Sequence, residues 1–356
     1  MEHPKFKILS IDGGGIRGVI PCQFLANLEN DLIQEYGEDT RLCDYFDLIA
    51  GTSTGGIIAI GLALGVKAQD ILDLYVRHGS EIFPEPMQRN VSKAKRIILK
   101  KPFYDRFPLK KLLNETFNTD GEPKRIGDAK TRLLIPTYNL ESHQIHILKT
   151  AHSEKLVRDY QIPVVDAALS TAAAPAYFLP YDFSYDNKGK NGSVQINMMV
   201  DGGLVANNPS FMALLEATHC LGIKLEDIGL LSLGTGVVKK ACPEKSSHVT
   251  PMYWVNPLNG PMIYEIMAEA QSVHVDNLLN LYKNGVGQAQ NDKFTYFRLQ
   301  HQFSENERIT LDSTSTTTIR KMLHAGHLLY RDNCCTIKTI FTTTEKQEFK
   351  PHYTFS

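Results

Sequence analysis

The sequence contains little cysteine and no excess of either charge. Its 356 residues include six cysteines without regular spacing, so we expect neither a disulfide framework nor a zinc module. The 38 basic side chains nearly balance the 39 acidic ones, which leaves a formal net charge of -1. That balance argues against a general binder of DNA or RNA. The 42% of hydrophobic residues excludes a disordered or collagen-like chain and suffices for a large buried core.

We expect neither a signal peptide nor a membrane-spanning helix. The opening residues, MEHPKFKILSIDGGG, lack the apolar core of a secretion signal. The uncharged stretch 48–66 is long enough to span a bilayer, but GTSTGG at residues 51–56 interrupts it. This stretch therefore predicts a buried strand, a sharp turn and a buried helix. Together with the low cysteine content, these features predict a protein of the cytoplasm.

Strands alternate with helices over most of the chain. Short apolar runs predict strands at residues 7–11, 46–50, 133–139, 144–148, 194–200 and 228–233. Helical periodicity predicts helices at 19–36, 56–64, 109–117, 164–174, 209–219, 263–282 and 317–330. The composition of residues 184–193 is typical of a polar loop. This alternation indicates an α/β fold with a largely parallel central sheet, and no linker or repeat divides the chain.

The strongest local motif is Gly51-Thr52-Ser53-Thr54-Gly55, between an expected strand and an expected helix. This is the context of a G-x-S-x-G nucleophile elbow. Small neighbours allow the backbones to approach, so that the serine hydroxyl projects above the edge of the sheet. The positive end of the following helix favours a developing anion. The five residues alone do not distinguish a nucleophile elbow from an ordinary turn, which is the alternative.

A glycine-rich segment, Asp12 to Gly18 (DGGGIRG), follows the first expected strand. A dinucleotide site would need an acidic residue at the end of the next strand, and that residue is missing. The Gly-Lys pair of a Walker loop is missing too. Consecutive glycines at a helix start can instead present backbone N–H groups to an oxyanion. A purely structural turn is the remaining alternative.

A third motif, Asp201-Gly202-Gly203, lies at the end of another expected strand. An aspartate in that position is often only a turn residue. A carboxylate with a raised pKa can, however, serve as the base that a serine nucleophile needs. Histidine is the usual base, but the histidines downstream of Asp201 lie in no comparable motif. They are His219, His274, His301, His324 and His327.

Together and in this order, the three motifs resemble those of the patatin-like phospholipases. The resemblance extends to KTRLLIPTYN, AALSTAAAPAYFLP, MVDGGLVANNP and LSLGTG, and covers about residues 5–240. It implies a three-layer α/β/α fold with a largely parallel sheet. We expect one catalytic domain over residues 1–356, in which residues 241–356 form a variable helical part.

The resemblance also implies roles for individual residues. By position, Ser53 is the nucleophile and Asp201 is its base, without a histidine. The implied oxyanion hole consists of Gly13, Gly14 and Gly15, with Arg17 steadying the loop. Gly18, Gly51, Gly55, Gly202 and Gly203 support the motifs. Many family members have alanine at the position of Gly203.

The activity that the resemblance implies is hydrolysis of fatty-acyl esters in membrane phospholipids through an acyl-enzyme, with no cofactor or metal. The opening of the sequence is similar to that of bacterial cytoplasmic members, some of which (the CapV type) are anti-phage effectors that a cyclic nucleotide activates. We therefore expect peripheral contact with the inner membrane face and treat a cyclic nucleotide activator as a hypothesis. The oligomeric state is open, with a homodimer or larger assembly on activation as one hypothesis. An acyltransferase or thioesterase with the same dyad, and a vestigial lipid- or nucleotide-binding module, are the alternatives.

The balanced net charge conceals one strongly basic segment. Residues 89–111 carry nine basic side chains and a single acidic one, Asp105. Apolar residues such as Ile97 and Phe103 lie between these charges. The segment predicts either a solvated helix face with a few buried anchors or a docking surface for an anionic membrane or activator. The candidate docking residues are Arg89, Lys93, Lys95, Arg96, Lys100 and Lys101.

Overall fold

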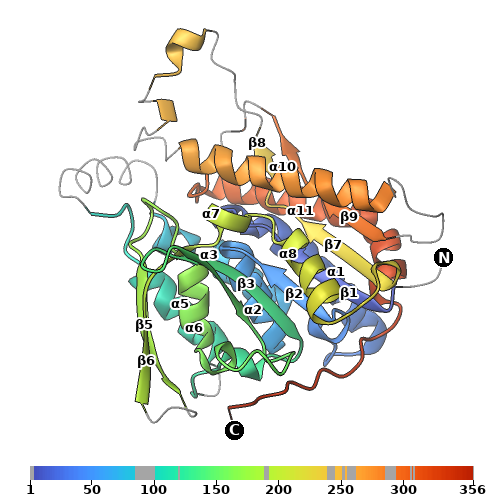
Figure 1. Cartoon of the computed structure of the whole chain (residues 1–356). Coiled ribbons are helices and arrows are strands. Elements are labelled where there is room, and N and C mark those ends of the chain that lie inside the picture. Colours follow the sequence, from blue (N-terminus) through green and yellow to red (C-terminus); the bar gives the residue numbers. More distant parts are fainter. Residues whose placement is uncertain are drawn as a thin grey trace.

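A largely parallel sheet forms the centre of the protein (Figure 1). The computed structural model describes residues 4–84, 101–118, 121–187, 192–238, 245–250, 253–254, 262–284, 294–304, 307 and 309–355. Within these residues, the sheet has eight strands in the order β5-β6-β3-β2-β1-β7-β9, with β4 paired to β3. The strands are β1 (Phe6–Ile11), β2 (Leu48–Gly51), β3 (Arg132–Asn139), β4 (Gln144–Lys149), β5 (Tyr181–Asn187), β6 (Gly192–Asp201), β7 (Ile228–Leu233) and β9 (Thr295–Leu299).

The strand pairing places the expected site motifs at one edge of the sheet. Strands β1, β2 and β7 and the start of β3 run parallel, as does β9 beside β7. Strand β6 pairs with β3 in the antiparallel direction, and β5 pairs with β6 in the same way. The predicted α/β class with a largely parallel sheet is therefore confirmed, with an antiparallel part at one end.

Helices cover both faces of the sheet. They are α1 (Val19–Tyr36), α2 (Thr54–Leu64), α3 (Ala68–Ile82), α5 (Phe107–Phe117), α6 (Val164–Thr171), α7 (Gly203–Ala206), α8 (Ser210–Leu215), α10 (Met262–Asn284) and α11 (Thr316–Ile337). Side chains of β1 alternate between two cores. Leu9 and Ile11 face the larger core under α1, α2 and α3, whereas Phe6 and Ile8 face the smaller core under α8. This alternation defines the three layers.

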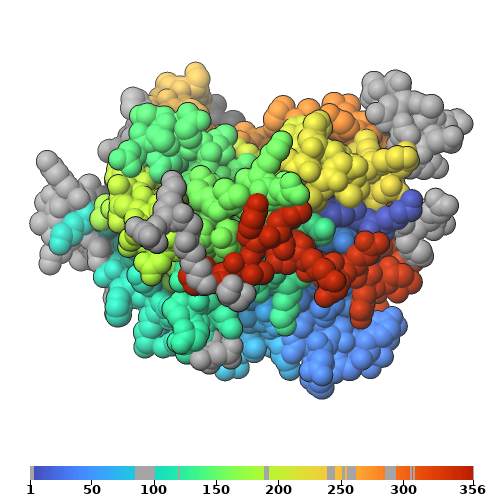
Figure 2. All heavy atoms as spheres, turned by 60° about the horizontal axis from the view of Figure 1, so that its bottom comes forward, coloured from blue at the N-terminus to red at the C-terminus, as the bar shows by residue number. Residues whose placement is uncertain are grey.

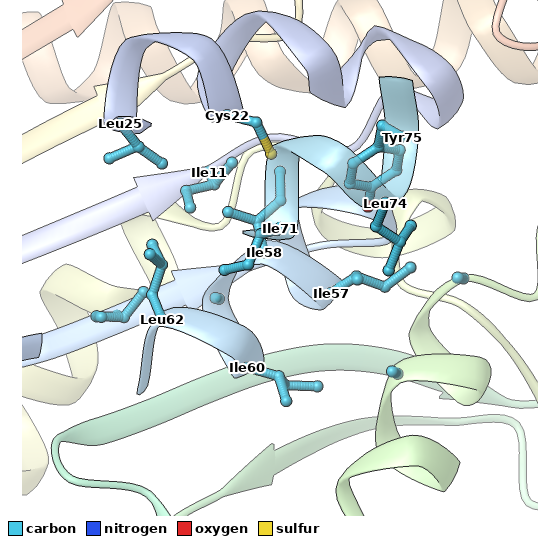
Figure 3. Packing of buried hydrophobic residues seen from close by; sticks show 14 of the residues in the cluster. Ile11, Cys22, Leu25, Ile57, Ile58, Ile60, Leu62, Ile71, Leu74 and Tyr75 are labelled. Carbon is cyan, nitrogen blue, oxygen red and sulfur yellow. The ribbon is translucent and has the colours of Figure 1, made fainter. Parts of the chain in front are cut away.

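The uncharged stretch 48–66 is part of the larger core. It forms β2, a turn and α2, as its sequence predicts, and every residue of α2 from Thr54 to Ala63 is buried. Figure 3 shows isoleucine and leucine side chains of α2 packed beneath α1 and α3. Gly65 then ends the helix in the left-handed conformation, with φ of 81°. In the described part of the chain, no helix is long and apolar enough to cross a membrane.

The prediction of a polar loop at residues 184–193 is wrong. Residues Tyr181–Asn187 form β5, and β6 begins at Gly192. The period-two pattern explains the strand, because Tyr181, Phe183 and Tyr185 are buried while the side chains between them are exposed. Several other predictions differ in length. Helix α6 ends at Thr171, before the predicted end at 174, and α11 extends to Ile337.

The C-terminal third is integrated into the fold. Strand β9 extends the sheet beside β7, and α11 packs along α1. The last residues, red in Figure 2, cross the face that also carries the green segments. There the N–H of His352 donates to the Ala151 carbonyl at 2.7 Å, and the N–H of Lys346 donates to the Asp44 carbonyl at 2.8 Å.

Candidate active site

Ser53 occupies a strained turn between β2 and α2. Its φ of 55° and ψ of -123° are unusual for a residue with a side chain. The two flanking glycines allow the close approach that this turn requires. A Cβ on Gly51 would lie 2.0 Å from the Gly55 carbonyl oxygen, and a Cβ on Gly55 would lie 2.3 Å from the Ile11 carbonyl oxygen. This is the geometry of a nucleophile elbow.

Asp201, the last residue of β6, lies directly beside this turn. The Oγ of Ser53 donates a hydrogen bond of 2.7 Å to Oδ2 of Asp201. The other carboxylate oxygen accepts a bond of 2.7 Å from the Gly203 N–H. Asp201 is fully buried, and Ser53 is 8% exposed. The structure thus brings two distant sequence motifs into one hydrogen-bonded pair.

The end of α6 fixes the two turns relative to each other. The hydroxyl of Thr171 accepts a bond of 3.0 Å from the Ser53 N–H and donates one of 2.7 Å to the Pro136 carbonyl. The Thr171 carbonyl accepts a bond of 3.3 Å from the Gly202 N–H. No local motif marks Thr171, although it lies in one of the blocks that carry the resemblance.

Burial prepares Asp201 to exchange a proton near neutral pH. Removal from water raises the pKa of this carboxyl to about 6. Hydrogen bonds from Ser53 and the Gly203 N–H, and the nearby Tyr264 hydroxyl, oppose the rise in pKa, because they stabilise the charged form. A carboxylate with a pKa in this range is a suitable general base.

The glycine-rich loop lies next to Ser53. A Cβ on Gly13 would lie 3.3 Å from the Ser53 Cβ. The Gly13 N–H donates to the Asn207 carbonyl at 3.0 Å, so its hydrogen is already engaged. Within the described part of the chain, neither the Gly14 nor the Gly15 N–H has a hydrogen-bond partner. These two groups are therefore the donors that remain for an oxyanion.

Asp12 anchors the start of this loop through a buried ion pair. Its carboxylate receives hydrogen bonds from both terminal nitrogens of Arg298, at 2.7 and 2.5 Å, and one from Ser272 at 3.3 Å. Burial raises the pKa of Asp12, and Arg298 opposes that rise. Arg298 belongs to β9, beyond the region of resemblance, so no sequence pattern marked it.

Arg17 lies on the wall of the same cavity. Burial lowers the pKa of its guanidinium, and Glu265 and Glu269 of α10 oppose this effect. Its Nε is buried and has no hydrogen-bond partner within the described residues. Gly18 contacts the nucleophile turn, because a Cβ there would lie 2.4 Å from the Thr54 hydroxyl.

A cavity of about 800 Å³ opens beside Ser53. Apolar side chains such as Ile57, Phe83, Leu109 and Phe178 form one part of its wall. No histidine is among the described residues that line it. The described chain also holds no group of three or more histidine, cysteine or acidic side chains that could bind a metal.

The basic docking segment is only partly within the described residues. Arg89, Lys93, Lys95, Arg96 and Lys100 lie outside them, and Lys101 is exposed. Arg106, from the same segment, is half-buried, with its guanidinium 4.8 Å from the centre of the Tyr181 ring. Phe103 is buried against Tyr177. The segment thus contains buried anchors, and its docking role stays a prediction.

The three-layer fold and the serine on a nucleophile turn define a serine hydrolase of the α/β class. Residues 9–214 match the family model described as patatin-like phospholipase. The chain belongs to this family, whose members are serine lipid acyl hydrolases, and the predicted family and enzyme class are confirmed.

Curated relatives extend the similarity along the chain. A protein of Vibrio cholerae named cGAMP-activated phospholipase is 33% identical and covers 92% of each chain. A protein of Escherichia coli with the same name is 34% identical over 66% of this chain and 63% of its own. Patatin-like protein 2 of Arabidopsis thaliana is 30% identical over 95% of this chain and 88% of its own.

Proposed function

We propose that this protein hydrolyses fatty-acyl esters of membrane phospholipids with Ser53 as nucleophile and Asp201 as general base. The observation that carries the proposal is the 2.7 Å hydrogen bond between the two side chains. Ser53 lines a cavity whose described lining contains no histidine. Asp201, with a pKa of about 6, is then the group that moves the proton.

Each half of the reaction uses Asp201 twice. As Ser53 Oγ attacks the ester carbonyl, its proton passes to Asp201 Oδ2. The tetrahedral intermediate then collapses to the acyl-enzyme, and the proton passes to the oxygen of the leaving lysophospholipid. In the second half, Asp201 takes a proton from water as the water attacks the acyl-enzyme. That proton returns to Ser53 Oγ when the fatty acid leaves.

The Gly14 and Gly15 N–H groups are the proposed oxyanion donors. They are the unengaged donors of the loop within the described chain, and the loop lies against the Ser53 Cβ. The ion pair between Asp12 and Arg298 holds the start of this loop in place. Preorganised donors of this kind stabilise a tetrahedral intermediate without reorganisation. The apolar wall around Phe83 and Phe178 suits an acyl chain.

A cyclic nucleotide is the proposed activator. Support comes from the two bacterial relatives that are named cGAMP-activated phospholipases, one of them similar over 92% of each chain. We propose that activation directs the enzyme from the cytoplasm to the inner face of the membrane in anti-phage defence. The basic segment that includes Lys101 would make the membrane contact, and assembly into a homodimer or larger oligomer is part of the same proposal. No metal or cofactor takes part in the proposed steps.

The experiment that tests this function is product analysis on phospholipid vesicles, with and without cyclic GMP–AMP. Fatty acid and lysophospholipid are the expected products, whereas transfer to an added acceptor would indicate an acyltransferase. S53A and D201A are expected to abolish hydrolysis and to keep the thermal unfolding transition. A fluorophosphonate probe is expected to label the wild type and not S53A. Full hydrolysis by S53A, or equal loss on replacing a single histidine, would contradict the proposal.

A further inference from the structure

Helix α10 brings a tyrosine hydroxyl to the carboxylate of Asp201. Tyr264 lies on the first turn of α10, outside the region of family resemblance, and lines the cavity over Ser53. Its hydroxyl lies beside the Asp201 carboxylate, because a single Cβ placed on Gly203 would lie 2.6 Å from the Tyr264 Oη and 3.0 Å from Oδ1 of Asp201. From there it lowers the pKa of Asp201, as a donor to the carboxylate does. Burial raises the pKa of Tyr264 well above its usual range, so the hydroxyl stays neutral and donates. Asp201 therefore accepts bonds from Ser53, just before α2, and from Gly203 of α7, and the Tyr264 hydroxyl of α10 lies next to them.

Gly203 makes room for this hydroxyl. A Cβ at position 203 would lie 2.6 Å from the Tyr264 Oη and 3.0 Å from Oδ1 of Asp201. A contact under 3 Å is too close for a methyl group, so an alanine would displace the tyrosine hydroxyl. The glycine in the Asp-Gly-Gly motif and the tyrosine on α10 thus form one structural unit.

The hydrogen bonds around α7 hold α10 in this position. Gln271 of α10 donates to the Leu204 carbonyl at 2.9 Å and accepts from the Asn207 N–H at 3.2 Å. The Asn207 side chain donates to Ser272 at 3.0 Å. Because α7 begins directly after Asp201, α10 is attached to the segment that carries the base. Figure 1 shows α10 lying along α7 and α8.

We propose that Tyr264 is a positioning residue, which orients the Asp201 carboxylate toward Ser53 and favours its ionised form. The inference rests on the proposed Ser53–Asp201 dyad and deepens it. A dyad without histidine has one group to move every proton, so the orientation and ionisation of that group are decisive. Tyr264 provides a donor that neither catalytic motif contains.

Among the described residues, the following polar and titratable groups face Asp201 and Tyr264. Ser53 and the Gly203 N–H face Asp201, and Tyr177 and Glu265 face Tyr264. Arg17 faces Glu265 and Tyr177 across the cavity. Both variants in the test below keep all of these groups, so a change in the pH profile reports on the Tyr264 hydroxyl.

The test is the pH profile of kcat/KM for Y264F with a short-chain ester, in the full chain and with cyclic GMP–AMP present if the wild type requires it. Loss of the hydroxyl is expected to move the rising limb of the profile upward by about 0.5–1 pH unit, because the ionised carboxylate loses a polar group that stabilises it. On the plateau, a fall of about tenfold is expected from the lost orientation. Y330F is the matched control, because the Tyr330 hydroxyl bonds Asp31 between α1 and α11. It is expected to keep the wild-type profile.

G203A provides a second route to the same result. Its methyl group is expected to displace the Tyr264 hydroxyl and to reproduce the upward shift. In the double variant G203A/Y264F the clash with Oη is absent, while the approach of 3.0 Å to Oδ1 of Asp201 remains. A profile equal to that of Y264F is expected if the shift in G203A comes from the tyrosine hydroxyl, and a larger shift would show that the methyl group acts on Asp201 directly. Profiles of Y264F and G203A that match the wild type would overturn the inference while S53A remains inactive. Activity in S53A would instead overturn the proposed dyad.

Discussion

The hydroxyl of Ser53 donates a hydrogen bond of 2.7 Å to the carboxylate of Asp201, from which it is separated by 148 positions in the chain. Sheet topology produces this contact. Strand β2 pairs in parallel with the first part of β3, and β6 pairs with the last part of β3 in the antiparallel direction, so the turns after β2 and β6 approach each other along β3. Thr171 then bonds to both turns. The nucleophile and its base are therefore assembled before any substrate binds.

The first prediction concerns the pH dependence of activity. Only ionised Asp201 can accept the Ser53 proton, and burial raises the pKa of Asp201 to about 6. We expect kcat/KM for a soluble ester to rise through about pH 6 and then to level off. A profile measured from about pH 4 to about pH 8 tests this expectation. A rate that is constant across this range would show that a different group moves the proton.

The second prediction is that D201N is inactive but more stable than the wild type at neutral pH. Because the pKa of Asp201 rises from 3.8 to about 6 on folding, the folded state binds more protons than the unfolded chain between these values. The free energy of unfolding of the wild type therefore falls as the pH rises through this window. Asparagine does not titrate, so the advantage of D201N is expected to grow by about 2 kcal/mol between about pH 4 and about pH 7.

Urea unfolding of both proteins at the two pH values measures this difference. E216Q is a useful comparison, because its stability relative to the wild type is expected to change with pH in the opposite direction. Burial would raise the pKa of Glu216, but bonds from His152 and Lys149 lower it to about 2. Its charged form stabilises the fold above pH 4.5, and that stabilisation is lost as the pH falls toward 2. E216Q is therefore expected to be less stable than the wild type at pH 7, and a gain in D201N that does not vary with pH would contradict the argument.

Much of the fold could be predicted because its signals are local. The bounds of α1 and β7 agree with the predictions, since each has a continuous apolar pattern and a clear end. The turn at Ser53 and the strand end at Asp201 were marked by glycines, whose small size the close backbone contacts require. Local patterns thus located the main elements of the site.

The remaining parts of the site depend on contacts between distant segments. Arg298 and Tyr264 reach Asp12 and Asp201 from the last third of the chain, and no motif marks either residue. Strand β9 was missed because its burial comes from pairing with β7 rather than from a long apolar run. Such partners are selected by tertiary packing, which a single sequence does not display.

The third prediction concerns Gly55. A Cβ at this position would lie 2.3 Å from the Ile11 carbonyl oxygen and 2.6 Å from that of Asp12. G55A must therefore separate α2 from the end of β1, and we expect a loss of about 3 kcal/mol of unfolding free energy. Because Asp12 begins the oxyanion loop, activity is expected to fall as well.

G121A is the matched control for G55A. Gly121 has a positive φ of 79°, and a Cβ added there would meet no described atom within 4 Å. The alanine there meets only the backbone strain of about 1–2 kcal/mol, and activity is expected to be unchanged. Equal stability losses and normal activity in both variants would show that the close approach at Gly55 is not required.

The fourth prediction concerns the buried pair of Asp12 and Arg298. R298M leaves the Asp12 carboxylate buried without its cation, and a loss of about 3–5 kcal/mol of unfolding free energy is expected. The double variant D12N/R298M removes that charge and is expected to recover part of the loss. K224M, which removes one partner of the exposed pair with Glu226, is expected to change stability by less than about 1 kcal/mol.

This prediction also tests whether residues 1–356 form one folding unit, as we propose. Arg298 enters from β9, and the loop that it holds carries Gly14 and Gly15. If the C-terminal third is part of the catalytic domain, R298M must lower both the unfolding midpoint in urea and the turnover of a soluble ester. A chain that ends at residue 240 is then expected to give no cooperative unfolding transition, because β7 loses β9 and α1 loses α11. An R298M enzyme with wild-type stability and turnover would instead show that the N-terminal 240 residues position the oxyanion loop without help.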